Sequence, residues 1–297
     1  MRRLLEAKVS KAREIPAGGR DTAGGIIPMF SEKVRAAAET NNSFLCIGLD
    51  PDPELMAHPH IPSFLQEIVD ATSDLVCAYK PNLAFFEALG MGGMQTMLES
   101  LRSVPKHIPI IADAKRGDID NTARFYARAL FDVYKFDAVT VNAYGGRDAV
   151  QPFIDYADRG VLVWCRSSNP GAADLQDMKL EDGRFVYEAI AERAREWNTG
   201  GNVGVVAGAT WPEQIERVRD ICPDMWILVP GVGAQEGDLE AAVQAAMNAD
   251  GGGFILNASR AVLYAAKDDG YAKSARKAAQ KLRSRINLMR EAALARR

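Results

Sequence analysis

The stretch IADAKRGDIDN places five charged side chains within eight positions, directly after an apolar run. Asp113 and Lys115 are two residues apart, so on a strand their side chains leave the same face. Lys80 ends another apolar run, and Asp118 lies in the turn before a helix expected at residues 119–132. An alternating array of these four side chains predicts either a salt-bridge ring or a reaction site.

We favour a reaction site for this charged array. Buried ion arrays seldom stabilise a fold more than apolar packing of the same volume would. Charged groups with perturbed pKa values cluster at functional sites, so a chain that keeps such an array is a reasonable place to look for chemistry. A fixed ammonium group can stabilise developing negative charge and then donate a proton. Arg116 and Asp120 are expected to be surface or helix-start charges.

Two later segments predict a phosphate site. PGVGAQEGD offers backbone N–H groups that glycine lets a ligand approach closely. NASRAVL places Ser259 and Arg260 at the expected start of a helix, where amide dipoles and a guanidinium group both favour a dianion. The alternative is that the glycines only turn the chain and that Arg260 pairs with a surface carboxylate.

Short apolar runs alternate with amphipathic segments of helical period along the chain. Near-continuous apolar runs are typical of parallel strands buried on both faces. Eight such units in about 250 residues predict a single-domain (β/α)8 TIM barrel. A doubly wound sheet is disfavoured because GLDPDPEL lacks the GxGxxG turn. The expected strands cover residues 44–50, 76–82, 108–115, 138–144, 160–168, 202–210, 226–233 and 252–259.

Polar residues stand at nearly all of the expected strand exits, whereas the strand interiors are apolar. The active site of such a barrel forms where the carboxyl ends of its strands meet. The polar exits therefore predict one shared site. They include Asp50, Lys80, Asn82, Asp113, Lys115, Asn142, Tyr144, Ser167, Ser168, Thr210, Gly231, Gln235, Ser259 and Arg260.

The composition is that of an ordinary globular protein. The 297 residues are 47% hydrophobic and carry a net charge of −3, which indicates neither a nucleic-acid nor a membrane partner. No apolar run reaches the ~18 residues that a membrane span needs, and the start lacks the apolar stretch of a secretory signal. The four cysteines form no CxxC pair, which indicates buried, reduced thiols and a cytoplasmic protein. The three histidines have no metal-ligand spacing.

Both ends of the chain are expected to differ from the barrel. Residues 1–28 include PAGGRDTAGG and lack an apolar period, which predicts a flexible N-terminal extension. An alternative is that Met29 is the natural start. Residues 29–297 are expected to form the barrel domain with a basic C-terminal helix. The apolar face of this helix, which should dock on the barrel, consists of Ala275, Leu282, Ile286 and Met289.

Seven motifs, in order, resemble those of the orotidine 5′-phosphate decarboxylase family in its longer bacterial branch. They are GLDPD, KPNLAFFE, DAKRGD, CRSSNPG, GATWPE, PGVGAQ and NASR, and the resemblance covers residues 29–270. D-x-K-x-x-D alone is shared with sister enzymes, but the seven motifs together are highly specific. The resemblance implies decarboxylation of orotidine 5′-phosphate to uridine 5′-phosphate, the last step of pyrimidine nucleotide synthesis. It also implies that no cofactor or metal is needed, and that the enzyme is a homodimer with active sites shared across the interface.

The resemblance also implies roles for individual residues. Lys115 would protonate a carbanion at C6, and Asp113 would sit beside the substrate carboxylate. Asp50 and Lys80 would bind ribose hydroxyls, and Lys80 would also order the charged array as one of the catalytic residues. Asp118 and Thr122 would reach the active site of the neighbouring subunit.

Further contacts with the substrate follow from the same resemblance. Ser168 would recognise the pyrimidine edge, although Ser167 beside it leaves an ambiguity of one residue. Gln235 and Arg260 would grip the phosphate. Residues 167–183 and the loop from Gly231 are the segments expected to close over the substrate.

Two other functions stay open. A Mg²⁺-dependent keto-sugar-phosphate decarboxylase or a hexulose-phosphate synthase also carries D-x-K-x-x-D, but holds its metal with a carboxylate at the end of the second strand. This chain has Lys80 there, which would repel Mg²⁺. A non-catalytic nucleotide-binding barrel should have lost Lys115 or one of the aspartates, and this chain keeps them all.

Overall fold

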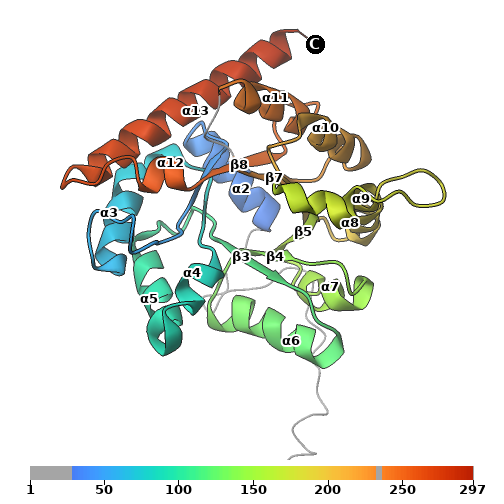
Figure 1. Ribbon diagram of the computed structural model, residues 1–297, viewed down its shortest axis with the longest axis horizontal. Coiled ribbons are helices and arrows are strands. Elements are labelled where there is room, and N and C mark those ends of the chain that lie inside the picture. Colours follow the sequence, from blue (N-terminus) through green and yellow to red (C-terminus); the bar gives the residue numbers. More distant parts are fainter. Residues whose placement is uncertain (1–28, 232–235, 297) are drawn as a thin grey trace, which may run out of the picture.

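The computed structural model describes residues 29–231 and 236–296. Its eight parallel strands form one sheet in the order β2-β1-β8-β7-β6-β5-β4-β3. Two isolated bridges, Tyr79 to Ile110 and Asn82 to Asp113, join the two edges of the sheet and close it into a barrel surrounded by helices (Figure 1). The predicted TIM barrel is confirmed. The prediction for residues 1–28 lies outside the described residues.

All eight expected strands are present. Each lies within its predicted range, except that β3 ends one residue later. The strands are β1 Leu45–Gly48, β2 Ala78–Lys80, β3 Ile111–Arg116, β4 Ala138–Val141, β5 Gly160–Arg166, β6 Val203–Ala207, β7 Ile227–Pro230 and β8 Phe254–Ala258. Most predicted strands extend beyond the observed strands. The additional residues lie outside the strands themselves, but they are apolar or belong to the polar exits, so the sequence pattern includes them.

Helices follow the strands and cover the outside of the barrel (Figure 1). The expected helix at 119–132 is divided into α6 and a π-helical turn, Ala129–Val133. The α-helices are α2 Phe30–Thr40, α3 Ile61–Thr72, α4 Leu83–Glu87, α5 Gly93–Ser100, α6 Asp120–Arg128, α7 Arg147–Ile154, α8 Ala173–Gln176, α9 Val186–Trp197, α10 Pro212–Ile221, α11 Glu236–Ala246, α12 Arg260–Leu263 and α13 Tyr271–Ala295.

The amino end of the barrel is plugged by α2. Phe30 and Val34 from this helix are buried in one cluster with strand residues such as Leu162. A Cβ at Gly160 would lie 2.3 Å from the Phe30 ring, so only glycine lets the helix approach so closely. Because this end is filled, an open site must form at the opposite, carboxyl end of the strands.

The C-terminal helix α13 runs along the outside of the barrel (Figure 1). Ala275 and Ile286 are fully buried, and Leu282 and Met289 pack against the same core, as predicted. Arg276 ties the helix to the Asp74 carboxylate at 2.6 Å.

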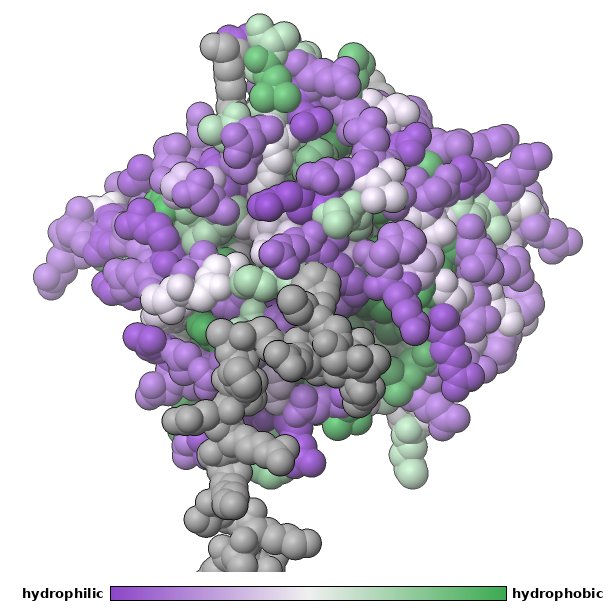
Figure 2. Space-filling model, turned by 180° about the vertical axis from the view of Figure 1, so that it is seen from behind, coloured by the Kyte–Doolittle hydropathy of each residue, from purple (hydrophilic) through white to green (hydrophobic). Residues whose placement is uncertain are grey.

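The surface opposite to the view of Figure 1 carries mostly hydrophilic side chains where grey atoms do not cover it (Figure 2). No described helix combines the length and the apolar character needed to cross a membrane. The four cysteines are buried and unpaired.

Candidate active site

One carboxylate bridges two ammonium groups at the carboxyl end of the barrel. Asp113 Oδ2 lies 2.8 Å from Lys80 Nζ, and Asp113 Oδ1 lies 2.6 Å from Lys115 Nζ. The Lys80 side chain is only 3% exposed, whereas that of Lys115 is 38% exposed. The buried lysine therefore fixes the carboxylate, and the carboxylate holds the more accessible lysine at the edge of the cleft.

The end of β3 is a bulge, not the regular strand that the two-residue spacing suggested. The register with β4 shifts between Ala112 and Arg116, and Lys115 has a φ of +44°. This left-handed conformation is costly for a residue with a side chain. Thr140 supports it: its Oγ1 accepts the backbone N–H groups of Ala114 and Lys115, both at 3.0 Å, and donates to Asp113 Oδ1 at 3.0 Å.

The two ion pairs keep Asp113 and Lys80 charged. Burial by itself would raise the pKa of the Asp113 carboxyl, but Lys80 and Lys115 outweigh burial and lower that pKa to about 2. Burial likewise disfavours the charged form of Lys80, yet Asp113 and Asp50 raise its pKa above 10.5. The positive and negative charges are therefore in place before any ligand arrives.

Two cavities meet at this array and form one continuous cleft. The smaller, about 210 Å³, has Lys80, Asp113, Lys115 and Thr140 on one side. Its apolar wall includes Trp164, Val206 and Leu228, and Ser167, Ser168 and Asn169 also line this cavity. The larger, about 860 Å³, extends past Asp50 and Asn82 to Ser259 and Arg260. Both cavities are lined by Lys80, Asp113, Ser168 and Pro230.

The apolar wall touches the accessible lysine. The Nζ of Lys115 lies 5.7 Å from the centroid of the Trp164 ring, within the range of a cation–π contact. An ammonium group between a carboxylate and an aromatic face has little freedom to move. The small cavity thus presents one oriented cation beside an aromatic ring.

The wide cavity is lined by four of the expected ligand-binding residues, which are Asp50, Lys80, Ser168 and Arg260. Asp50 Oδ1 accepts the backbone N–H of Asn82 at 3.1 Å, and the Tyr264 hydroxyl donates to the Asp50 carbonyl at 2.7 Å. Arg260 begins α12, which is a single turn and has only a small dipole. The guanidinium group, more than the helix, makes this end of the cleft attractive to an anion.

Two residues expected to reach the substrate, Asp118 and Thr122, do not lie at the array within this chain. The Asp118 carboxylate accepts the N–H of Ile119 at 2.8 Å, and Thr122 is exposed on α6. Neither residue lines the two described cavities. Gln235 lies outside the described residues.

Arg116 and Asp120 have partners at the surface, where they were expected. Arg116 pairs with Glu87 from α4, and Asp120 pairs with Arg124 one turn further along α6 at 2.8 Å. Neither side chain joins Lys80, Asp113 and Lys115.

Sequence reasoning did not single out Thr140 or Trp164. Thr140 is the one polar residue in the AVTV run of β4, and a hydroxyl inside a buried strand is a signal for a specific hydrogen-bonded role. Trp164 gives no such signal, because an aromatic residue in a buried strand normally belongs to the core.

Comparisons with known proteins point to one family. Residues 43–275 match the model of the orotidine 5′-phosphate decarboxylase / HUMPS family. The orotidine 5′-phosphate decarboxylase of Roseiflexus sp. (strain RS-1) is 52% identical over 266 residues, which cover 87% of this chain and 97% of the relative. The relative of the same name from Cellvibrio japonicus (strain Ueda107) is 49% identical over 271 residues, 88% of this chain and 99% of that protein.

A solved structure agrees with these relatives. The OMP decarboxylase of Leishmania donovani superposes with a TM-score of 0.80 at 41% sequence identity, and the match covers 89% of this chain and 99% of that one. The barrel, the charged array and the sequence matches lead to the same conclusion: this chain belongs to the orotidine 5′-phosphate decarboxylase / HUMPS family.

Proposed function

We propose that this chain decarboxylates orotidine 5′-phosphate to uridine 5′-phosphate without a cofactor or metal. The observation that carries the proposal is the pairing of Asp113 with both Lys80 and Lys115, in a cleft that extends to Arg260. A ligand with an anionic reacting group at one end and a phosphate at the other matches this distribution of charge.

Lys115 is the proposed catalytic acid. Loss of CO₂ from C6 of the orotate ring breaks a C–C bond and leaves its electron pair in an sp² orbital, which no adjacent carbonyl can delocalise. An ammonium group already fixed beside C6 stabilises this charge without reorganising at the moment of reaction. One N–H proton of Lys115 then forms the new C6–H bond, and solvent returns a proton to the amine.

Asp113 and the apolar wall favour departure of the carboxylate. A substrate carboxylate placed beside Asp113 is repelled, and this repulsion disappears as the group leaves as neutral CO₂. Trp164, Val206 and Leu228 suit CO₂ better than they suit an anion. Both effects disfavour the bound substrate more than the transition state.

The remaining residues of the cleft are proposed to bind the parts of the substrate that are remote from the reacting carbon. Arg260 and Gln235 bind the phosphate, and Asp50 and Lys80 bind ribose hydroxyls. Binding energy from these remote groups can be used to stabilise the transition state.

Of the two adjacent serines, Ser168 is the better candidate for recognising the pyrimidine edge of the substrate. It lines both cavities, whereas Ser167 lines only the smaller one. Ser167 is also 8% exposed, and its hydroxyl accepts a hydrogen bond from Gln176 Nε2 at 2.7 Å.

A homodimer is proposed in which Asp118 and Thr122 complete the partner's site. The turn and helix that carry them also expose large apolar side chains, and exposed apolar patches mark interaction surfaces. A two-fold interface at this face would bring the same turn of each subunit to the other subunit's cleft. The exposed side chains are Ile119, Phe125, Tyr126, Val133 and, on the loop after β4, Tyr144.

We also propose that the protein is cytoplasmic and that its barrel domain is preceded by a separate N-terminal extension. Four buried thiols without a disulfide suit a reducing compartment. The barrel domain would begin at residue 29, with residues 1–28 as an extension.

The alternatives have less support. A Mg²⁺-dependent sister enzyme needs an acidic ligand where Lys80 lies, and that lysine is buried and already paired with Asp113. A non-catalytic barrel would not need an accessible lysine held against a carboxylate.

The test is a spectrophotometric assay of purified enzyme with orotidine 5′-phosphate in the presence of EDTA. We expect the ultraviolet band of the orotate ring to disappear and uridine 5′-phosphate to accumulate. An unchanged band would overturn the proposal, and activity that EDTA abolishes would favour the metal-dependent alternative.

A further inference from the structure

The connection from β5 to α9 is fastened to the end of β5 by Gln176, the last residue of α8. Its Oε1 accepts the backbone N–H of Ser167 at 2.9 Å, and its Nε2 donates to the Ser167 hydroxyl at 2.7 Å. One amide group therefore holds both the backbone and the side chain of a residue that lines the small cavity.

A buried guanidinium group supports this amide from behind. Arg166 is 2% exposed, and its Nη1 donates to Gln176 Oε1 at 3.1 Å. Its Nε donates to Gln214 from α10, and its Nη2 lies 3.2 Å from Asp177 Oδ2. A buried charge is costly unless it is paired and hydrogen-bonded, so this set of partners has little freedom to rearrange.

A displacement of Ser167 would act on Ser168, the next residue, whose backbone is packed closely against Gly208. A Cβ at Gly208 would lie 2.7 Å from the Ser168 nitrogen, so the two backbones are already in close contact. The Thr210 hydroxyl donates to the Ser168 carbonyl at 3.2 Å. A shift of Ser167 must therefore change how Ser168 faces the cleft.

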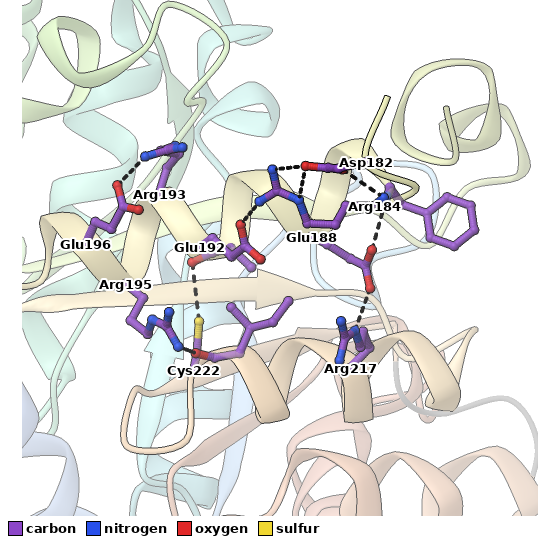
Figure 3. A network of polar contacts seen from close by, with 12 residues as sticks. Asp182, Arg184, Glu188, Glu192, Arg193, Arg195, Glu196, Arg217 and Cys222 are labelled. Carbon is purple, nitrogen blue, oxygen red and sulfur yellow. Dashed lines mark hydrogen bonds and ion pairs between the residues drawn. The ribbon is translucent and has the colours of Figure 1, made fainter. Parts of the chain in front are cut away.

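The far end of the same connection is held by separate contacts (Figure 3). Arg184 pairs with Asp182 and Glu192. Glu188 accepts the N–H of Phe185 at 2.8 Å and pairs with Arg217 at 2.6 Å. None of these contacts reaches Ser167, so they cannot replace Gln176 at the near end.

We propose that Gln176 is a positioning residue for pyrimidine recognition, which acts by holding Ser167 and, through it, Ser168. The inference rests on the proposed function and deepens it. The side chain of Gln176 needs no contact with the substrate for this role.

The test compares Gln176→Leu with Gln176→Glu. Leucine removes the three hydrogen bonds, and misplacement of substrate-contacting groups should lower kcat/KM by about 10- to 100-fold. Glutamate can still accept from Arg166 and from both Ser167 groups, so it should keep kcat/KM within about threefold of wild type. Gln214→Leu is the matched control: it removes one hydrogen bond from Arg166 and none from Ser167, so it should lower Tm with little effect on kcat/KM.

A binding measurement separates positioning from a general loss of structure. Uridine 5′-phosphate has a pyrimidine and ribose 5-phosphate does not. In Gln176→Leu, the Kd for uridine 5′-phosphate should rise by about tenfold or more, because Ser168 is no longer in position to bind the pyrimidine. The Kd for ribose 5-phosphate should stay within about twofold of wild type, because this ligand has no pyrimidine. If Gln176→Leu does not fold, Gln176→Asn replaces it, because that shorter amide does not reach Ser167 and the same losses are expected.

Three results would overturn the inference while leaving the proposed function intact. They are wild-type kcat/KM in the leucine variant, an equal loss of affinity for both ligands, and an equal loss of kcat/KM in Gln214→Leu. A wild-type enzyme that does not consume orotidine 5′-phosphate would instead overturn the proposed function.

Discussion

Thr140 Oγ1 accepts the backbone N–H of Lys115 at 3.0 Å, although the two residues are on different strands. The same oxygen accepts the N–H of Ala114 and donates to Asp113. It therefore supports both the left-handed backbone of Lys115 and the carboxylate that holds the Lys115 ammonium group. Thr140 has no proposed contact with substrate, yet the geometry of the array depends on it.

Thr140→Val should impair catalysis more than its small change in volume suggests. Two partly buried N–H groups would lose their acceptor, at a cost of at most about 1–3 kcal/mol each. Relaxation of the bulge would move Lys115, and we expect kcat to fall by about 10- to 100-fold. Thr140→Ser keeps the hydroxyl and should retain most of the activity. Steady-state kinetics of both variants measure this difference in kcat, with Tm as a control for stability. Equal kcat values in the valine and serine variants would contradict a role for the Thr140 hydroxyl in catalysis.

A shared active site predicts complementation between two inactive variants. Lys115→Ala and Asp118→Ala should each be inactive alone. A mixed dimer would have both substitutions at one site and none at the other. Random reassortment of equal amounts makes half of the dimers mixed, so activity should recover to about a quarter of wild type. The measurement is activity after co-refolding, with each variant refolded alone as the control, and no recovery would argue that each chain forms a complete site.

The acid stability of the protein should depend on Asp113. Its pKa is lowered from 3.8 to about 2 in the folded protein. A carboxyl with a lowered folded pKa stabilises the fold above its unfolded pKa, and this contribution is lost as pH falls through the folded pKa. The free energy of unfolding should therefore drop between about pH 4 and pH 2, and less so in Asp113→Asn. Urea unfolding at several pH values measures both slopes, and equal slopes would exclude a role for this carboxylate.

The sequence predicted well what depends on local pattern. The eight strands were recognisable because buried parallel strands are near-continuous apolar runs. The placement of Asp113 and Lys115 at one strand end, and of Lys80 at its neighbour, followed from the barrel topology once the strands were counted. The docking face of α13 followed from helical spacing, which Ala275 and Ile286 confirm.

Contacts between distant segments could not be predicted in this way. The φ of Lys115 depends on a hydroxyl from the next strand, and no local pattern encodes that pairing. Trp164 looked like a core residue because its sequence context is the same whether it faces a core or a cleft. Gln176 reaches Ser167 only because the short α8 folds back on the end of β5.

The central claim is that Lys115 stabilises the carbanion at C6 and protonates it. The most direct test is kcat of Lys115→Ala with orotidine 5′-phosphate, measured with the circular dichroism spectrum and the Kd for uridine 5′-phosphate. Loss of the ammonium group removes electrostatic stabilisation and the general acid together, so kcat should fall by at least about 10³-fold, with the spectrum unchanged and the Kd within about tenfold of wild type. A kcat within tenfold of wild type in a folded, ligand-binding variant would contradict the account.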